Sequence, residues 1–171
     1  MSVAGPVLGL DFGTRRIGLA VSDHDGRIAF PAGCLESQGT EKDLQALCAL
    51  VEKREITRVV VGLPIHLDGR AGPEADAARA FARGVAEATG LPVEMLDERW
   101  TTLEAERALR EGKRAGGARA ASRRRGQSVE RGKRGGAARA ADRRRRGYVD
   151  AVAATILLRC YLERRRTGDA S

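Results

Sequence analysis

Two short apolar runs near the start of the chain, residues 7–12 and 17–21, are joined by the four-residue turn Gly-Thr-Arg-Arg. Apolar runs of this length around a glycine-containing turn predict a β-hairpin. A second turn at residues 23–26 leads into a third expected strand near residues 27–35. The chain is therefore expected to begin with a layer of antiparallel strands.

Beyond these strands, the hydrophobic pattern alternates between helix and strand periods. Apolar residues spaced three and four apart predict helices, and short apolar runs bounded by turns predict buried strands. One expected helix begins with Thr101 and Glu104 at the spacing of a capping box. The expected elements, in chain order, are a helix at 41–54, a strand at 59–61, a helix at 73–89, a strand at 93–97, and helices at 101–112 and 147–164. This order implies an α/β chain with a mixed five-stranded sheet flanked by helices, which is the order of an RNase H-like fold.

Residues 113–146 interrupt this pattern with a dense run of basic residues. The segment holds 14 Lys and Arg against two acids, so the rest of the chain carries a net charge of −4 although the whole chain carries +8. Residues 112–125 recur as residues 132–145 with three differences, which indicates an internal duplication. Because the segment has almost no large apolar residue to bury, we expect it to be disordered without a partner.

This basic segment is expected to bind the phosphates of a nucleic acid. A solvated low-complexity loop is the alternative interpretation. Because the segment has no aromatic residue to stack on bases, it would add affinity but no sequence choice. The arginines expected to contact the substrate are Arg123, Arg124, Arg143 and Arg144. The expected organisation is one domain over residues 1–164, interrupted at 113–146, with a polar tail at 165–171.

The composition argues against membrane insertion, export and zinc binding. No apolar run approaches the roughly 20 residues that span a bilayer, and the N-terminus has no signal-peptide pattern. Cys34, Cys48 and Cys160 lie far apart and in no zinc-like spacing. They are expected to be reduced thiols of a cytoplasmic protein.

Asp11 lies within the first apolar strand. Strand alternation places it on the same face as Val7 and Gly9, where a carboxylate is costly unless its charge is compensated. Gly13 permits close approach of the backbone to a ligand, and Thr14 offers a hydroxyl and an amide to a phosphate oxygen. Taken alone, the motif fits a site residue and a turn aspartate bonded to backbone amides equally well.

Two further acids fall where a solvated side chain is not expected. Asp150 leads the apolar face of the last expected helix, although an acid near a helix start is also stabilised by the helix dipole. Glu98 closes the fifth strand, a position where loop-borne site residues collect. A surface acid paired with Arg99 is one alternative there, and Asp97 in place of Glu98 is another.

Together, Asp11, Glu98 and Asp150 offer oxygen ligands from three separate elements. Hard cations such as Mg²⁺ or Mn²⁺ prefer oxygen, and two ions about 4 Å apart can activate a water and stabilise the leaving oxygen of a phosphodiester. We therefore expect these three carboxylates to be both metal ligands, for two ions, and catalytic residues of a hydrolase. His24 and His66 lie in a turn and a loop and do not form a zinc pattern.

These residues occur in motifs that resemble those of the YqgF family, also called RuvX. The motifs are Leu10-Asp11-Phe12-Gly13-Thr14 with Ile17-Gly18-Leu19-Ala20-Val21, Val61-Gly62-Leu63-Pro64, Asp68-Gly69, Asp97-Glu98-Arg99 with Thr101-Thr102, and Val149-Asp150 with Ala153-Ala154 and Ile156-Leu157. The match covers nearly the whole chain except residues 113–146. The resemblance implies an RNase H-like nuclease related to RuvC-type resolvases, whose members are named as pre-16S rRNA nucleases or Holliday junction resolvases.

The resemblance also implies roles for single residues. Asp11, Glu98 and Asp150 match the family's acidic triad of metal ligands. Gly13 and Thr14 are implied beside the metals, and Arg99 near the substrate phosphate.

The chain departs from the family pattern at two places. The loop before the last aspartate is normally short, so the duplicated basic segment is unusual. Family members commonly have a Lys or Arg shortly before that aspartate. Here Gly147 and Tyr148 occupy the positions before Val149 and Asp150. The nearest basic residue is Arg146, four positions upstream of Asp150, and whether it takes that role is left open.

Three functions remain as interpretations. The favoured one is a metal-dependent endonuclease that processes the 5′ end of precursor 16S rRNA in ribosome biogenesis. The second keeps the chemistry but acts on a four-way DNA junction in recombination and repair, which would require two active sites and hence a C₂ dimer; monomer and homodimer both stay open. The third is a non-catalytic RNA-binding module. The turn after Asp11 also resembles the phosphate-binding turn of sugar kinases, but those proteins close two domains around ATP and need a longer chain.

Overall fold

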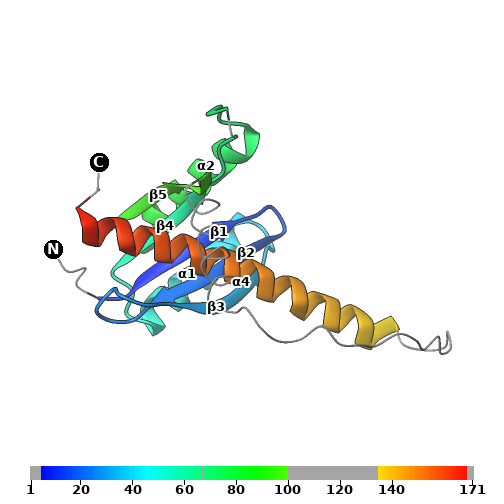
Figure 1. Ribbon diagram of the computed structural model, residues 1–171. Coiled ribbons are helices and arrows are strands. Elements are labelled where there is room, and N and C mark those ends of the chain that lie inside the picture. Colours follow the sequence, from blue (N-terminus) through cyan, green and yellow to red (C-terminus); the bar gives the residue numbers. More distant parts are fainter. Residues whose placement is uncertain (1–4, 67, 100–134, 169–171) are drawn as a thin grey trace, which may run out of the picture.

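A five-stranded mixed sheet forms the centre of the protein, as the sequence predicts (Figure 1). The computed structural model describes residues 5–66, 68–99 and 135–168. The strand order is β3-β2-β1-β4-β5; β1, β2 and β3 pair antiparallel, whereas β1 with β4 and β4 with β5 pair parallel. The strands are β1 (Val7–Phe12), β2 (Arg16–Ser22), β3 (Ala29–Glu36), β4 (Arg58–Leu63) and β5 (Val93–Asp97).

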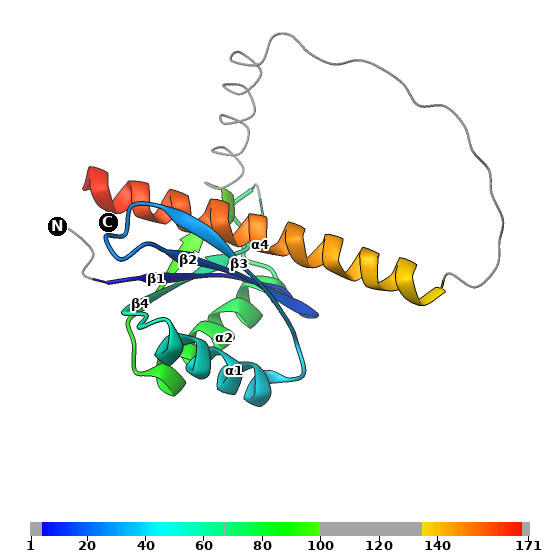
Figure 2. The same cartoon turned by 90° about the horizontal axis from the view of Figure 1, so that it is seen from below.

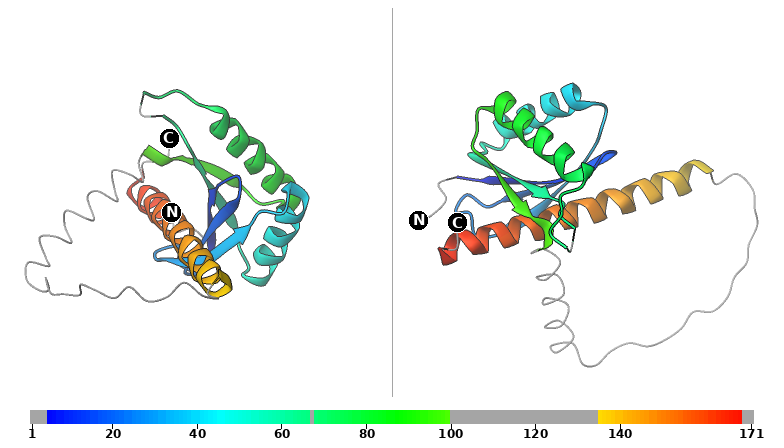
Figure 3. Two further views of the ribbon diagram at one scale, coloured as in Figure 1. Left: turned by 90° about the vertical axis from the view of Figure 1, so that its right-hand side faces the viewer. Right: turned by 90° about the horizontal axis from the view of Figure 1, so that it is seen from above.

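Helices cover both faces of this sheet. Helices α1 (Thr40–Lys53) and α2 (Pro73–Thr89) lie on one face, and α4 (Gly135–Thr167) crosses the other (Figures 2 and 3). Strand alternation divides the core accordingly, because Leu8 and Leu10 pack toward α1 and α2 whereas Val7 packs toward α4. The α4 face is therefore the face on which alternation also places Asp11.

Helix α4 lies unusually close to the sheet where it crosses β2 and β1. A Cβ atom on Gly18 would lie 2.1 Å from the backbone oxygen of Asp150, and one on Gly9 would lie 2.9 Å from the Cβ of Leu158. Real Cβ atoms do not approach backbone this closely, so glycine at these strand positions lets the helix backbone approach the sheet. These contacts bring Asp150 to the edge of the sheet at which β1 ends.

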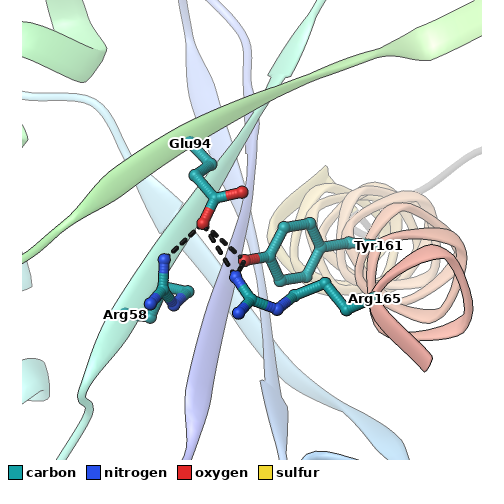
Figure 4. A network of polar contacts seen from close by, with 4 residues as sticks. All are labelled: Arg58, Glu94, Tyr161 and Arg165. Atoms are coloured by element: carbon teal, nitrogen blue, oxygen red, sulfur yellow. Dashed lines mark hydrogen bonds and ion pairs between the residues drawn. The ribbon is translucent and has the colours of Figure 1, made fainter. Parts of the chain in front are cut away.

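A polar network fixes the C-terminal part of α4 at the other end of its path (Figure 4). The hydroxyl of Tyr161 and the guanidinium of Arg165 donate hydrogen bonds of 2.9 and 3.0 Å to Oε1 of Glu94 in β5. Arg58 of β4 forms an ion pair with the same oxygen. The guanidinium carbon of Arg165 also lies 5.7 Å from the centre of the Tyr161 ring. Helix α4 is thereby tied to β4 and β5, on the side of the sheet away from β3.

The start of α4 corrects one expectation from the sequence. We expected a helix beginning at residue 147 and disorder over residues 113–146, but α4 begins at Gly135. The prediction was wrong for residues 135–146 because it weighed only apolar burial. Ala and Arg are good helix formers, and a helix that continues from a packed segment needs no new nucleation. The expected helix at 101–112 and residues 113–134 lie outside the described residues.

The state of the cysteines agrees with the expectation from the sequence. Cys34, Cys48 and Cys160 are free thiols. Among the described residues, no helix has the length and apolar character needed to cross a membrane.

Candidate active site

Asp11 lies near the end of β1, on the sheet face that α4 covers. It is the register partner of Gly18 in β2, and a Cβ on that glycine would lie 3.3 Å from the Cβ of Asp11. Burial raises the pKa of Asp11 above its usual value, and the nearby negative charge of Asp150 raises it further. The strand thus holds a poorly solvated carboxylate beside a second acid.

Glu98 directly follows β5, and its carboxylate extends over β4. Oε1 of Glu98 lies 2.6 Å from the position that a Cβ on Gly62 would take, so the absence of a side chain at Gly62 makes room for it. Burial raises the pKa of Glu98 to about 7, with added repulsion from Asp11 and Asp97. Asp11 and Glu98 therefore interact as like charges across the parallel strands.

Asp97, the alternative to Glu98, has a different environment. Its two carboxylate oxygens accept hydrogen bonds of 2.6 to 3.1 Å from the side chain of Arg99, and Oδ1 also accepts one from the Arg99 backbone amide. These bonds hold the pKa of Asp97 below its usual value. The structure thus sets Asp97 in an ion pair and Glu98 beside Asp11.

Asp150 reaches the site from α4 and is bound by an arginine of β2. Nε of Arg16 donates a hydrogen bond of 2.6 Å to Oδ2 of Asp150. Both side chains are about three-quarters buried, at 27% and 26% exposed. Arg16 was not predicted as a site residue, although it lies at the end of the Gly-Thr-Arg-Arg turn that follows the strand of Asp11.

The other predicted substrate contacts are all at least partly exposed. Gly13 and Thr14 are exposed in the turn after β1, and the Gly13 amide donates to the carbonyl of Arg16 at 3.0 Å. Arg99 is 40% exposed and lies beside Gly69. Arg146 is exposed on α4, one helical turn before Asp150.

The arginines predicted in the basic segment cannot be placed at the site. Arg123 and Arg124 lie outside the described residues. Arg143 and Arg144 fall within α4, but the structure describes only the helix at these positions.

The donor chemistry of this site suits a divalent cation of the Mg²⁺ type. Asp11, Glu98 and Asp150 supply hard oxygen ligands. Burial first, and then neighbouring acids, raise the pKa values of Asp11 and Glu98, and a bound cation would compensate the charge of these poorly solvated carboxylates. Within the described residues, however, no three acidic, histidine or cysteine side chains already stand close enough to hold a metal ion. The carboxylates therefore fit the ion by type, while Asp150 is engaged by Arg16.

The fold is similar to that of solved RuvC structures. Thermus thermophilus RuvC in complex with a Holliday junction substrate superposes with a TM-score of 0.56, covers 98% of each chain and is 14% identical in sequence. A second Thermus thermophilus RuvC structure gives a TM-score of 0.50 over 95% of this chain and 96% of its own, also at 14% identity. At this identity the likeness establishes the RNase H-like fold and nothing about the substrate.

Sequence comparisons identify the family. The family model described as "RuvX: Holliday junction resolvase" matches residues 5–127. Proteins named "Putative pre-16S rRNA nuclease" are 36% identical in Chloroflexus aurantiacus, covering 95% of this chain and 89% of theirs, and 38% identical in Koribacter versatilis, covering 96% and 90%. A protein of the same name from Anaeromyxobacter dehalogenans is 39% identical over 92% of this chain and 96% of its own. The chain therefore belongs to the RuvX family of nucleases.

Proposed function

We propose that this protein is a metal-dependent endonuclease that hydrolyses phosphodiester bonds near the 5′ end of precursor 16S rRNA. The observation that supports the chemistry is that Asp11 interacts electrostatically with Glu98 after β5 and with Asp150 of α4, and that Asp11 and Asp150 both lie beside Gly18. The names of relatives that match over most of both chains support the substrate. Such a substrate would place the protein in the cytoplasm.

In this proposal Asp11, Glu98 and Asp150 hold Mg²⁺ or Mn²⁺. When bound, the ions supply an activated water and stabilise charge on the leaving oxygen. Glu98 has to be ionised to act as a ligand, and its pKa of about 7 means that its carboxyl loses its proton near neutral pH. Metal loading is therefore expected to be weaker below neutral pH.

The turn after β1 would receive the phosphate next to the cleaved bond. The amide of Gly13 is already bonded to the carbonyl of Arg16, so Gly13 shapes the turn and does not donate to the substrate. Thr14 is exposed, and its hydroxyl can donate to a phosphate oxygen. Arg99 stays paired with Asp97 and is a contact for a more distant phosphate.

The basic part of the chain would bind the nucleic acid without reading its sequence. Arg145 and Arg146 are exposed on α4 and continue the cationic run toward Asp150. Contacts of arginine with phosphates supply affinity that falls as salt rises. Arg123, Arg124, Arg143 and Arg144 belong to the same proposed surface.

A four-way DNA junction is the second candidate substrate. The description of the matching family favours it. Two symmetric cuts need two active sites, so this substrate requires a homodimer, whereas processing of an rRNA end does not.

The test compares Asp11→Asn with Asp25→Asn, which removes the charge of an exposed turn residue that follows the far end of β2 from Asp11. Each protein is assayed with Mg²⁺ or Mn²⁺ on precursor 16S rRNA and on a four-way junction. Loss of one metal ligand is expected to reduce cleavage by at least 10-fold to 100-fold, the order seen for altered metal sites, while Asp25→Asn cleaves like the unmodified protein. Unchanged cleavage by Asp11→Asn would remove the metal assignment, and cleavage of the junction alone would replace the rRNA substrate.

A further inference from the structure

Arg16 lies at the point where the exposed turn meets the acidic site. It is the first residue of β2, and the next residue, Ile17, is buried in the core on the α1 and α2 side. Because neighbouring residues of a strand point to opposite faces, Arg16 lies on the α4 face, together with Asp11 and Asp150. Its side chain can therefore interact with the acids and with a substrate held at the turn.

The guanidinium of Arg16 uses only one of its three nitrogens. Nε donates to Oδ2 of Asp150 at 2.6 Å. In the part of the chain that the structure describes, its two terminal nitrogens make no hydrogen bond. A planar guanidinium with free donors is suited to two hydrogen bonds with a phosphate. The side chain is 27% exposed, so such a ligand can reach it.

The contact with Arg16 also bears on the metal site. Asp150 carries one negative charge, and Arg16 already neutralises it from inside the protein. A divalent cation that binds the same carboxylate is repelled by the guanidinium. Among the described residues the acids do not stand together as a three-ligand cluster, and Asp150 is the one that Arg16 binds.

We propose that Arg16 is an exchangeable counter-cation of Asp150. In the free protein it holds Asp150, and on binding of nucleic acid its guanidinium transfers to a backbone phosphate, which leaves the carboxylate to the metal ion. This inference rests on the proposed nuclease function. Because linkage between two ligands is reciprocal, metal and nucleic acid strengthen each other's binding. Arg16 is thus a positioning residue in the free protein and a phosphate-binding residue in the complex.

Two measurements that need no catalysis test the exchange. Arg16→Met is compared with Arg15→Met, which removes the same charge from the neighbouring exposed residue. The affinity of the free protein for Mn²⁺ is measured by calorimetry, and the affinity for precursor rRNA is measured in EDTA. Arg16→Met is expected to bind Mn²⁺ about tenfold more tightly, within the usual range of coupling between linked ligands, and to bind RNA more weakly than Arg15→Met does.

Several results would overturn the inference. Weaker binding of Mn²⁺ by Arg16→Met would mean that Arg16 orients Asp150 as a ligand. Unchanged Mn²⁺ affinity with a lower melting temperature would make the ion pair purely structural. Equal loss of RNA affinity in both variants would show that Arg16 has no special phosphate contact.

Arg16→Lys keeps the inference testable if Arg16→Met does not fold. Lysine retains the charge but lacks the planar fork. We expect its Mn²⁺ affinity to stay close to that of the unmodified protein and its RNA affinity to fall; a tenfold gain in Mn²⁺ affinity would contradict competition by charge. The Mn²⁺ titration uses no nucleic acid and needs no cleavage. Unchanged cleavage by Asp11→Asn would therefore overturn the proposed function separately from the inference about Arg16.

Discussion

Replacing Glu98 with Gln is predicted to stabilise the metal-free protein at pH 8 more than at pH 5. In the folded protein burial and neighbouring acids raise the pKa of Glu98 from 4.5 to about 7. Between these values the folded state keeps a proton that the unfolded state releases, so the free energy of unfolding falls as pH rises and levels off above pH 7. Glutamine has no proton to lose, and its variant avoids this decrease.

The magnitude follows from the size of the pKa change. Each unit of difference in pKa between the folded and unfolded states corresponds to about 1.4 kcal/mol, so the effect of Glu98 on the free energy of unfolding has an upper limit on the order of 3 kcal/mol. Because the carboxylate is only partly buried, solvent screening reduces this to on the order of 1–2 kcal/mol. Urea unfolding at pH 5 and pH 8 in EDTA measures it, with Glu87→Gln on the exposed side of α2 as the control.

A difference between Glu98→Gln and the unmodified protein that is the same at both pH values would refute this reasoning. Such a result would mean that Glu98 is solvated or that a protein cation compensates its charge. A second measurement separates these cases. Mn²⁺ at saturating concentration should raise the melting temperature of the unmodified protein more than that of Glu98→Gln, because only a ligand bound to the folded state stabilises it.

Two further predictions concern the path of α4 and the basic segment. Gly18→Ala is expected to lower the free energy of unfolding by about 1–3 kcal/mol, as an overpacked contact does, because the added Cβ would clash with the backbone of α4 at Asp150. Thermal unfolding measures this loss. The control is Gly84→Ala in α2, where the added Cβ would contact only the flexible end of Leu44 and stability should not fall. Deleting residues 113–134, which removes basic residues but leaves α4 complete, should weaken RNA binding and flatten the slope of log affinity against log salt without abolishing cleavage; an unchanged slope would show that these residues do not contact phosphates.

The sheet and the two helices on its first face were predictable from the sequence because each has one clear hydrophobic period. The expected and observed bounds of β1, α2 and β5 are the same, and those of α1 differ by one residue at each end. The start of α4 was not predictable from apolar burial. Residues 135–146 bury little that is apolar, and their helix depends on the packed turns that follow them.

The candidate site was predictable in part. Asp11 and Asp150 could be found because each acid falls on an apolar face of a regular element. Between Asp97 and Glu98 the sequence could not decide, since the answer depends on the side chain of Arg99 bonding to Asp97. The contact of Arg16 with Asp150 was not predicted because the two residues are 134 positions apart in the chain. Hydrophobic periodicity carries information about neighbouring residues only, and not about a contact at that separation.

The continuity of α4 has a consequence for how this chain can have grown. The second copy of the duplicated sequence, residues 132–145, continues into α4, the helix that carries Asp150. From Gly135 onward, each residue of this copy therefore has a fixed position around the helix axis relative to Asp150. Insertion or loss of residues before that point changes neither the rotation nor the distance of Asp150 on the sheet. A duplication at this place could therefore spread through a population without passing through a form with a misaligned third acid.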